Sequence, residues 1–247
     1  MFVLCFAMTF ILGFAISPAA QTRTPGSSNG RLTTIDEALR SHHIELTRPA
    51  LVKALRNEDA EVRSLAAQKL AEQNATETIP AILDSLTAET RPETRVNIAF
   101  SLAQLGETRG FNALQDTCRD PGMRPDLRVE AARYMHDLNH EDAICRSALV
   151  DMLQSPADPD ARAQAASLLP RFQDLSPQES RKIFQGVLKA LEAPEPTVRL
   201  AASHALSEIG DKSAISNLQK AVANEQDKAV RSQLQMDLQE LQQKKNQ

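Results

Sequence analysis

His136, His140 and Glu141 are the residues whose types and spacing come closest to a chemical site. Imidazole and carboxylate groups bind zinc or iron, and two histidines four residues apart share one face of a helix. However, the helical pattern that contains His136 ends near Asn139, so His140 falls in the following turn. We therefore expect these two histidines to lie at the surface and predict neither a metal site nor a cofactor.

No other stretch matches a catalytic motif. The sequence contains no Gly-x-Ser-x-Gly nucleophile motif, no phosphate-binding P-loop and no Cys-x-x-Cys pair. Each of these motifs places a nucleophile, a phosphate or a redox couple at a fixed turn. The acidic residues are scattered, and no pair stands out as an acid and base. We therefore predict no catalytic residues.

The three cysteines do not predict a disulfide. Cys5 lies in the apolar N-terminal segment, Cys118 is expected to end one helix, and Cys145 is expected to begin the next helix of the same layer. If those two helices run parallel and start at the same level, the two cysteines lie at opposite ends, about eight helical residues apart along the axis. At about 1.5 Å per residue, this separates the sulfurs by about 12 Å. That distance exceeds the reach of a disulfide, so we expect two unbridged cysteines.

Composition favours an alanine-rich helical core over a sheet. The 247 residues are 42% hydrophobic but only 4% aromatic, with one tyrosine and no tryptophan. Small aliphatic side chains suit closely packed helices, whereas sandwiches and barrels use more β-branched and aromatic residues. The net charge is −4, with both signs interspersed. This charge and the scarcity of stacking aromatics argue against a nucleic-acid partner.

The N-terminal segment predicts export. Residues 2–16 are almost wholly apolar and are followed by the small residues Ser-Pro-Ala-Ala. We interpret residues 1–20 as a signal peptide or an N-terminal anchor, and residues 21–32 as a flexible linker. About 15 apolar residues are short for a membrane span, which needs about 20. If the segment is uncleaved, residues 1–16 would tether the chain to a membrane. Either alternative places the protein in the periplasm or at a membrane, outside the cytoplasm.

One arginine recurs six times at nearly constant spacing. Successive arginines are 32, 33, 34, 37 and 32 residues apart. Each precedes an apolar series with spacings of three and four, such as Ala202, Leu206 and Ile209 after Arg199. These spacings place the apolar side chains on one face of a helix. The six members are Arg63, Arg95, Arg128, Arg162, Arg199 and Arg231.

A period of this length with one helix pair per period is typical of a solenoid. We predict an all-α fold, a right-handed α-α superhelix of about six helix pairs over residues 33–247. A threonine-capped helix at 36–43 is expected to cover its first repeat. The outer helices are expected at 49–56, 78–87, 109–118, 142–154, 177–192 and 213–223, and the arginine-bearing inner helices at 60–73, 92–105, 125–138, 159–169, 196–209 and 227–243.

The repeated pattern acid–x–Val–Arg–x–x–Ala–Ala–x–x–Leu resembles the HEAT-like repeat, including the repeats of phycobilin lyases. The resemblance covers roughly residues 48–243 and is strongest around Val62-Arg63 and Val198-Arg199. Deoxyhypusine hydroxylases, which are also HEAT-like, carry His-Glu pairs on several helices, whereas only His140-Glu141 is present here. The resemblance therefore implies a solenoid without that di-iron site.

The arginine ladder, meaning the six arginines named above, has two interpretations. Each guanidinium could bond an acid or a carbonyl in its own or the neighbouring turn and so join one repeat to the next. This structural role is also what the HEAT resemblance implies. Alternatively, the arginines could form a basic stripe for an anionic ligand. We favour the structural interpretation.

The concave face supplies the candidate binding residues. In each inner helix, we count from the residue directly before the ladder arginine, which is valine in the repeated pattern. The positions two, six and nine residues after it point away from the core of the solenoid. An exposed apolar patch edged by charge is typical of a partner site, although neighbouring helices could instead bury these side chains. The candidates are Val96, Phe100, Val129, Arg133, Leu200 and His204.

These observations lead to one functional hypothesis and one alternative. We predict a non-catalytic, exported scaffold that binds a protein or peptide on the concave face of the solenoid. The alternative is an enzyme or chromophore-handling protein similar to the phycobilin lyases. An export signal argues against that alternative, because such lyases work in a compartment where the signal would be out of place.

Overall fold

The computed structural model describes residues 34–140, 142–155 and 158–244. The predicted signal peptide or anchor at 1–20 and the linker at 21–32 lie outside these residues. Within them the chain forms thirteen α-helices, three short 3₁₀ turns and no strand. The helices are α1 Ile35–Ser41, α2 Arg48–Ala54, α3 Ala60–Glu72, α4 Ile79–Ala88, α5 Pro92–Gln104, α6 Thr108–Arg119, α7 Pro125–Asp137, α8 Ala143–Leu153, α9 Pro159–Leu168, α10 Pro177–Ala190, α11 Pro196–Ile209, α12 Ile215–Asn224 and α13 Lys228–Gln243, with 3₁₀ turns η1 Thr76–Thr78, η2 Leu169–Arg171 and η3 Lys212–Ala214.

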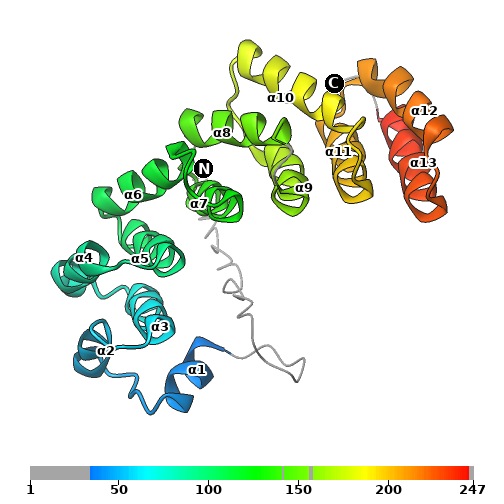
Figure 1. The fold of residues 1–247 in the computed structure, drawn as a ribbon. Helices are drawn as coiled ribbons and strands as arrows, with labels where there is room; N and C mark the ends of the chain where they lie inside the picture. The colour runs from blue at the N-terminus through cyan, green and yellow to red at the C-terminus, as the bar shows by residue number, and fades with distance from the viewer. Residues whose placement is uncertain (1–33, 141, 156–157, 245–247) are drawn as a thin grey trace, which may run out of the picture.

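The helices form two layers that curve into an arc (Figure 1). The even-numbered helices α2 to α12 make the outer, convex layer, and the odd-numbered helices α3 to α13 make the inner, concave layer. Helix α1 packs on α3 and covers the first repeat. The predicted all-α solenoid of six helix pairs is thereby confirmed. Within the described ranges, no helix has the length and apolar character that a membrane crossing requires.

The helix boundaries follow from local chemistry. Helices α5, α7, α9 and α11 begin with proline, whose missing N–H costs nothing in the first turn. The carboxylates of Asp59, Asp158 and Asp227 accept backbone N–H groups at the starts of α3, α9 and α13. Gly210 ends α11 with a φ of 78°, the left-handed conformation that glycine adopts without strain. Thr34 and Glu37 form a reciprocal capping box on α1.

Small residues line the closest helix contacts. Ala66 on α3, Ala99 on α5, Ala165 on α9 and Ala202 on α11 are all fully buried. Their size lets the backbones of α3 and α5, and of α9 and α11, approach closely. Helix α6 approaches α5 closely too, because a Cβ added at Gly110 would lie 2.5 Å from the backbone nitrogen of Ala103.

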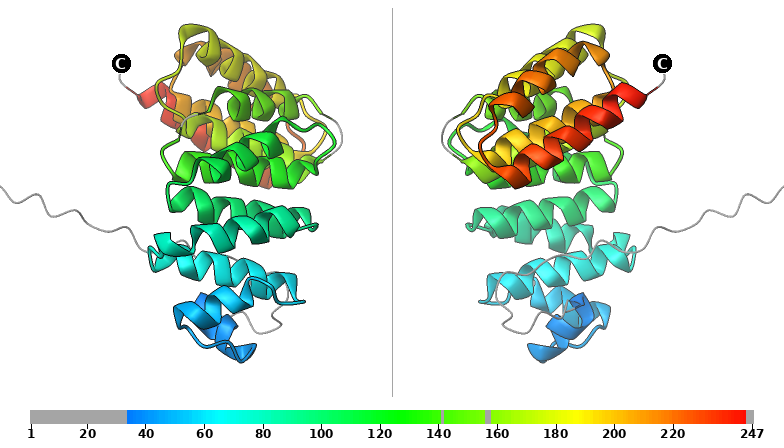
Figure 2. Two further views of the ribbon diagram at one scale, coloured as in Figure 1. Left: turned by 90° about the vertical axis from the view of Figure 1, so that its left-hand side faces the viewer. Right: turned by 90° about the vertical axis from the view of Figure 1, so that its right-hand side faces the viewer.

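Helix α7 is the exception among the inner helices. The backbones of α5 and α7, and of α7 and α9, are further apart than those of α3 and α5 or of α9 and α11. Aromatic side chains fill the wider spaces: Phe100 of α5 stacks on Tyr134 of α7 with ring centroids 3.9 Å apart, and His136 of α7 lies edge-on to Phe172, 5.3 Å away. The helices up to α7 form nearly level layers, whereas the later helices are tilted (Figure 2).

The prediction of unbridged cysteines is wrong. Cys118 in the last turn of α6 forms a disulfide with Cys145 in the first turn of α8, with their Cα atoms 5.0 Å apart. The prediction assumed that successive outer helices start at the same level. Instead α8 is staggered lengthwise, so that its first turn meets the last turn of α6 (Figure 1).

The six arginines of the ladder occupy one structural position, at the start of each inner helix. Every one of them donates to a backbone carbonyl at or just after the end of the outer helix of its own pair. Such carbonyls, in the last turn of a helix or in the turn that follows it, have no N–H partner within the helix. The acceptors are Asn57 and Glu58 for Arg63, Leu86 for Arg95, Cys118 for Arg128, Leu153 for Arg162, Ala193 and Pro194 for Arg199, and Glu225 for Arg231.

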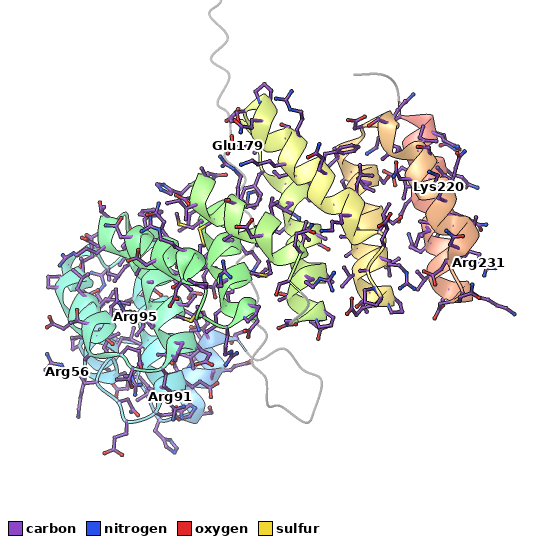
Figure 3. All side chains as sticks on the ribbon, turned by 45° about the horizontal axis from the view of Figure 1, so that its top comes forward. Arg56, Arg91, Arg95, Glu179, Lys220 and Arg231 are labelled. Atoms are coloured by element: carbon purple, nitrogen blue, oxygen red, sulfur yellow. A yellow bond between two sulfur atoms is a disulfide. The ribbon has the colours of Figure 1, made fainter. Side chains whose placement is uncertain are left out.

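Three of these arginines also pair with an acid in the turn of the next repeat. The partners are Glu89 for Arg63, Glu195 for Arg162 and Glu225 for Arg199, each with an N–O distance of 2.7 or 2.8 Å. Glu89 and Glu225 each follow their arginine by 26 residues and are almost fully buried. Figure 3 labels Arg95 and Arg231, two ladder members near opposite ends of the solenoid.

Candidate partner-binding groove on the concave face

A groove of about 650 Å³ lies between α7 and α9 in the inner layer. It occupies one of the two places, α5–α7 and α7–α9, where neighbouring inner helices are further apart than elsewhere in the inner layer. We call it the α7–α9 groove. Its lining residues are Asp126, Val129, Glu130 and Arg133 from α7, and Ala163, Gln164, Ser167, Leu168 and Arg171 from α9 and η2.

A small charge network forms the α7 side of the groove. The Arg133 guanidinium donates to Asp137 at 3.1 Å and to Glu130 at 3.3 Å, partners four residues after it and three before it. Its carbon Cζ also lies 4.6 Å from the centre of the Tyr134 ring. These contacts hold the guanidinium in one place at the groove wall. A partner would therefore meet a fixed array of charges.

The buried Tyr134 contacts this charge network through its hydroxyl. Its hydroxyl lies 2.7 Å from Asn97 Oδ1 and 3.0 Å from Glu130 Oε1, and its single proton is donated to one of them. Burial, and next the negative charge of Glu130, raise the pKa of the Tyr134 hydroxyl well above its usual value. The hydroxyl therefore stays protonated and serves as a hydrogen-bond donor.

The α9 side of the groove is less charged. Ala163 and Leu168 form apolar parts of it, and Gln164 is exposed beside them. Pro170 follows the end of α9 within η2, and η2 directs the exposed Arg171 to the groove. Within the residues that the structure describes, Arg171 has no ion-pair partner. The groove thus offers an unpaired cation and an amide beside a small apolar surface.

The structure brings some of the sequence-predicted residues together and separates others. Val129 and Arg133 both line the groove, and Phe100 stacks on Tyr134 beside it. For Val96 and Val129, the structure shows the second of the two alternatives, burial by neighbouring helices, because they are only 1% and 3% exposed. Helix α5, for example, packs on α3, α4, α6 and α7, so that a wide arc of its surface is buried.

Leu200 and His204 belong to α11 and lie outside the groove. Leu200 is half-buried, and His204 places Nδ1 3.7 Å from Asp237 and Nε2 3.5 Å from Glu208. The buried Asp237 also accepts a 2.6 Å hydrogen bond from Ser203. A Ser-His-Asp triad needs the serine hydroxyl to donate to the imidazole, and here it donates to the carboxylate. We therefore interpret this cluster as packing between α11 and α13.

Of the candidate binding residues named from the sequence, only Val129 and Arg133 line the groove. Gln164 and Arg171 in the lining, and Tyr134 beside it, were not named. Glu130 and Asp137, spaced three and four residues from Arg133, were a detectable signal of a fixed charge network on α7. The only tyrosine of the chain, placed in an otherwise aromatic-poor solenoid, was a second signal. Nothing in the sequence marked Gln164 or Arg171, because their exposure depends on how far α9 stands from α7.

The histidines considered as metal ligands do not converge in the structure. His140 packs against Phe111 with ring centroids 4.4 Å apart, and His136 packs against Phe172. Among the residues that the structure describes, no three His, Cys, Asp or Glu side chains gather as a metal site.

Comparisons with known proteins place the chain among helical repeat proteins. The structure is similar to human deoxyhypusine hydroxylase in complex with glycerol, at 15% identity and a TM-score of 0.42, covering 80% of this chain and 85% of that one. It is also similar to the complex of CpcE and CpcF of phycocyanin lyase from Nostoc sp. PCC7120, at 20% identity and a TM-score of 0.35, covering 80% and 89%. No curated protein matches the sequence. A family model for HEAT repeats matches residues 48–131 and 146–239.

Proposed function

The chain belongs to the HEAT repeat family, and we propose that it is a non-catalytic scaffold that binds a protein or peptide segment in the α7–α9 groove. The observation that carries this proposal is the groove itself. It lies on the concave face, it combines small apolar surfaces with fixed charges, and it holds an arginine without an ion-pair partner among the described residues. Partner sites of this kind place charged groups around a limited apolar centre.

The groove chemistry indicates what the partner presents. Arg171 and Gln164 offer donors on the α9 side. On the α7 side, the carboxylates of Glu130 and Asp137 are already engaged by Arg133. An extended segment with one small apolar side chain and an acidic or carbonyl-rich neighbour would match the apolar surface and the donors of the α9 side. A bulky aromatic side chain would fit less well, because the buried apolar residues of the lining expose little surface.

Site-specific cross-linking tests this proposal. A photoreactive residue at Gln164 in the groove should cross-link to a partner in the native extract, whereas the same residue at Gln185, exposed on the outer helix α10, should not. With the partner identified and purified, Arg171→Glu should weaken binding at least tenfold. Lys182→Glu on α10 is the matched charge reversal and should leave binding unchanged. Equal cross-linking from Gln185, or wild-type affinity of Arg171→Glu, would place the binding site elsewhere.

We also propose that the protein is exported. The apolar segment at 2–16 is one reason, and the Cys118–Cys145 disulfide is a second and independent one. Disulfides form and persist in oxidising compartments such as the periplasm, and they are rare in the cytosol. Neither reason distinguishes a cleaved signal from a retained membrane anchor.

Fractionation under non-reducing conditions tests the export proposal. Cells are fractionated, and each fraction is denatured in the presence of a maleimide-polymer that adds mass to free thiols before it is analysed for the protein. We expect the protein in the envelope or periplasmic fraction, with Cys118 and Cys145 unlabelled until a reductant is added. Recovery in the cytosolic fraction with both thiols labelled would refute export.

A further inference from the structure

The Cys118–Cys145 disulfide closes a loop around one complete helix. The two cysteines are 27 residues apart, and the loop between them contains the whole of α7. Two hydrogen bonds join the same helices. Arg128 of α7 donates to the carbonyl of Cys118 in α6, and Gln115 of α6 donates to Asp142 at the start of α8 with a distance of 2.7 Å. The outer helices α6 and α8 are thus joined directly, across the helix that lies between them in sequence.

The enclosed helix is also the inner helix with the widest spacing. The backbone of α7 stands further from α5 and α9 than the other inner helices stand from their neighbours, and aromatic rings fill the spaces. In a repeat protein each unit contacts only its neighbours, so that stability propagates through successive interfaces. Two weaker interfaces in succession would let the parts on either side open independently. The residues between the two HEAT-matching ranges, 132–145, fall in this region as well.

We propose that α7 is the joint between two halves of the solenoid, α1–α6 and α8–α13, and that the Cys118–Cys145 disulfide clamps this joint. With the clamp closed, the halves fold and unfold together and hold one curvature. With the clamp open, each half keeps its own alanine-lined core, while α7 exchanges between packed and open states. This proposal does not depend on what binds in the α7–α9 groove.

Opening the clamp needs a two-electron reductant. A dithiol thiolate attacks one sulfur of the disulfide, breaking the sulfur–sulfur bond and forming a mixed disulfide. The second thiol of the reductant then displaces the protein sulfur. Two electrons and two protons pass to Cys118 and Cys145, and the dithiol becomes a disulfide. Both cysteines are fully buried, so the attack requires the joint to open first. We therefore expect reduction to be slow in native buffer and faster in low urea.

Hydrogen exchange on the full chain tests the clamp, using dithiothreitol as the reductant. In the reduced protein we expect amide exchange in α7 and the first turn of α8 to rise at least tenfold, with α3, α5 and α11 unchanged. Urea unfolding followed by circular dichroism should change from one transition in the oxidised protein to two in the reduced protein. The variant Cys118→Ala/Cys145→Ala should behave as the reduced protein does. If that variant fails to fold, the reduced wild type still tests the proposal, because it keeps both sulfurs and lacks only their bond.

A matched control separates a local joint from general weakening. Arg199→Ala lowers stability in the C-terminal half, so in the reduced protein it should raise exchange further in α11 to α13 and leave α3 and α5 unchanged. The proposal is overturned if reduction leaves exchange in α7 unchanged. It is equally overturned if reduction raises exchange to the same extent in every helix, or if the reduced protein unfolds in a single transition.

Discussion

Replacing Arg199 with alanine should be among the most damaging single changes in the arginine ladder. Its guanidinium donates to both oxygens of Glu225, with distances of 2.7 and 2.8 Å, and to the carbonyls of Ala193 and Pro194. The side chain of Glu225 is only 2% exposed, so Arg199→Ala would leave a buried carboxylate without its cation. Breaking such a pair from one side costs about 3–5 kcal/mol in the free energy of unfolding.

The pH dependence gives a second measure of the same interaction. Hydrogen bonds from Arg199 lower the pKa of Glu225 from 4.5 to about 2, against the opposing effect of burial. Because the pKa is lowered in the folded state, the stabilisation is complete above pH 4.5 and is lost as the pH falls through about 2. At about 1.4 kcal/mol per pKa unit, it amounts to about 3 kcal/mol at pH 7 and about 2 kcal/mol at pH 3.5. The deficit of Arg199→Ala should shrink accordingly between these two values.

Urea unfolding followed by far-ultraviolet circular dichroism is the assay, because the chain has no tryptophan. Arg48→Ala is the control, since Arg48 pairs with Glu77 at the same 2.7 Å but both side chains are more than half exposed. An exposed pair contributes less than about 1 kcal/mol, so this control should hardly change the midpoint. The reasoning fails if Arg199→Ala costs no more than Arg48→Ala, or if its cost is the same at pH 7 and pH 3.5.

Three further outcomes are expected. Gly110→Ala should destabilise the fold by about 3 kcal/mol or prevent folding, because its Cβ would lie 2.5 Å from the Ala103 nitrogen and helices α5 and α6 would have to separate; a urea midpoint equal to that of the wild type would contradict this. Phe100→Ala should cost about 2 kcal/mol through lost burial and stacking on Tyr134, and Phe100→Leu about half as much; equal midpoints for the two variants would show that the ring contact contributes little. Purified protein incubated with bilins should stay colourless, and a stable visible absorbance band after gel filtration would revive the chromophore-handling alternative.

The helices were predictable because the signals that define them are local. Proline at the first turn, an aspartate cap and apolar spacings of three and four recur in each period, and they act within a few residues of the boundary they set. For this reason the predicted and observed bounds of α5, α7 and α11 differ by no more than one residue. The position of Arg199 relative to its helix was predictable on the same grounds. Its partner Glu225 was not named in advance, because that contact joins two repeats.

The disulfide could not be predicted, because it depends on how two helices are staggered. Sequence places Cys118 at the end of α6 and Cys145 at the start of α8, and both placements are correct. The error came from assuming equal levels for successive outer helices. The stagger results from packing over the whole of α7, and no short pattern around either cysteine encodes it.

The candidate groove was predictable only in part for a related reason. Val129 and Arg133 were named as candidates from the sequence, and both line the α7–α9 groove. Sequence periodicity left open whether Val96 and Val129 are exposed or buried by neighbouring helices, and the structure shows them buried. A helix wheel describes one helix against one core, whereas an inner helix such as α5 packs on four others, α3, α4, α6 and α7.

One physical cause connects the groove, the joint and the disulfide. Where alanines face each other, as between α9 and α11, the helices approach closely. Where Phe100 meets Tyr134 and where His136 meets Phe172, the larger rings hold α7 away from its neighbours, which opens the groove and weakens the interfaces together. A scaffold that gains a binding groove in this way loses stability at the same place. A covalent link between α6 and α8, enclosing α7, restores that stability without filling the groove, because it lies in the outer layer.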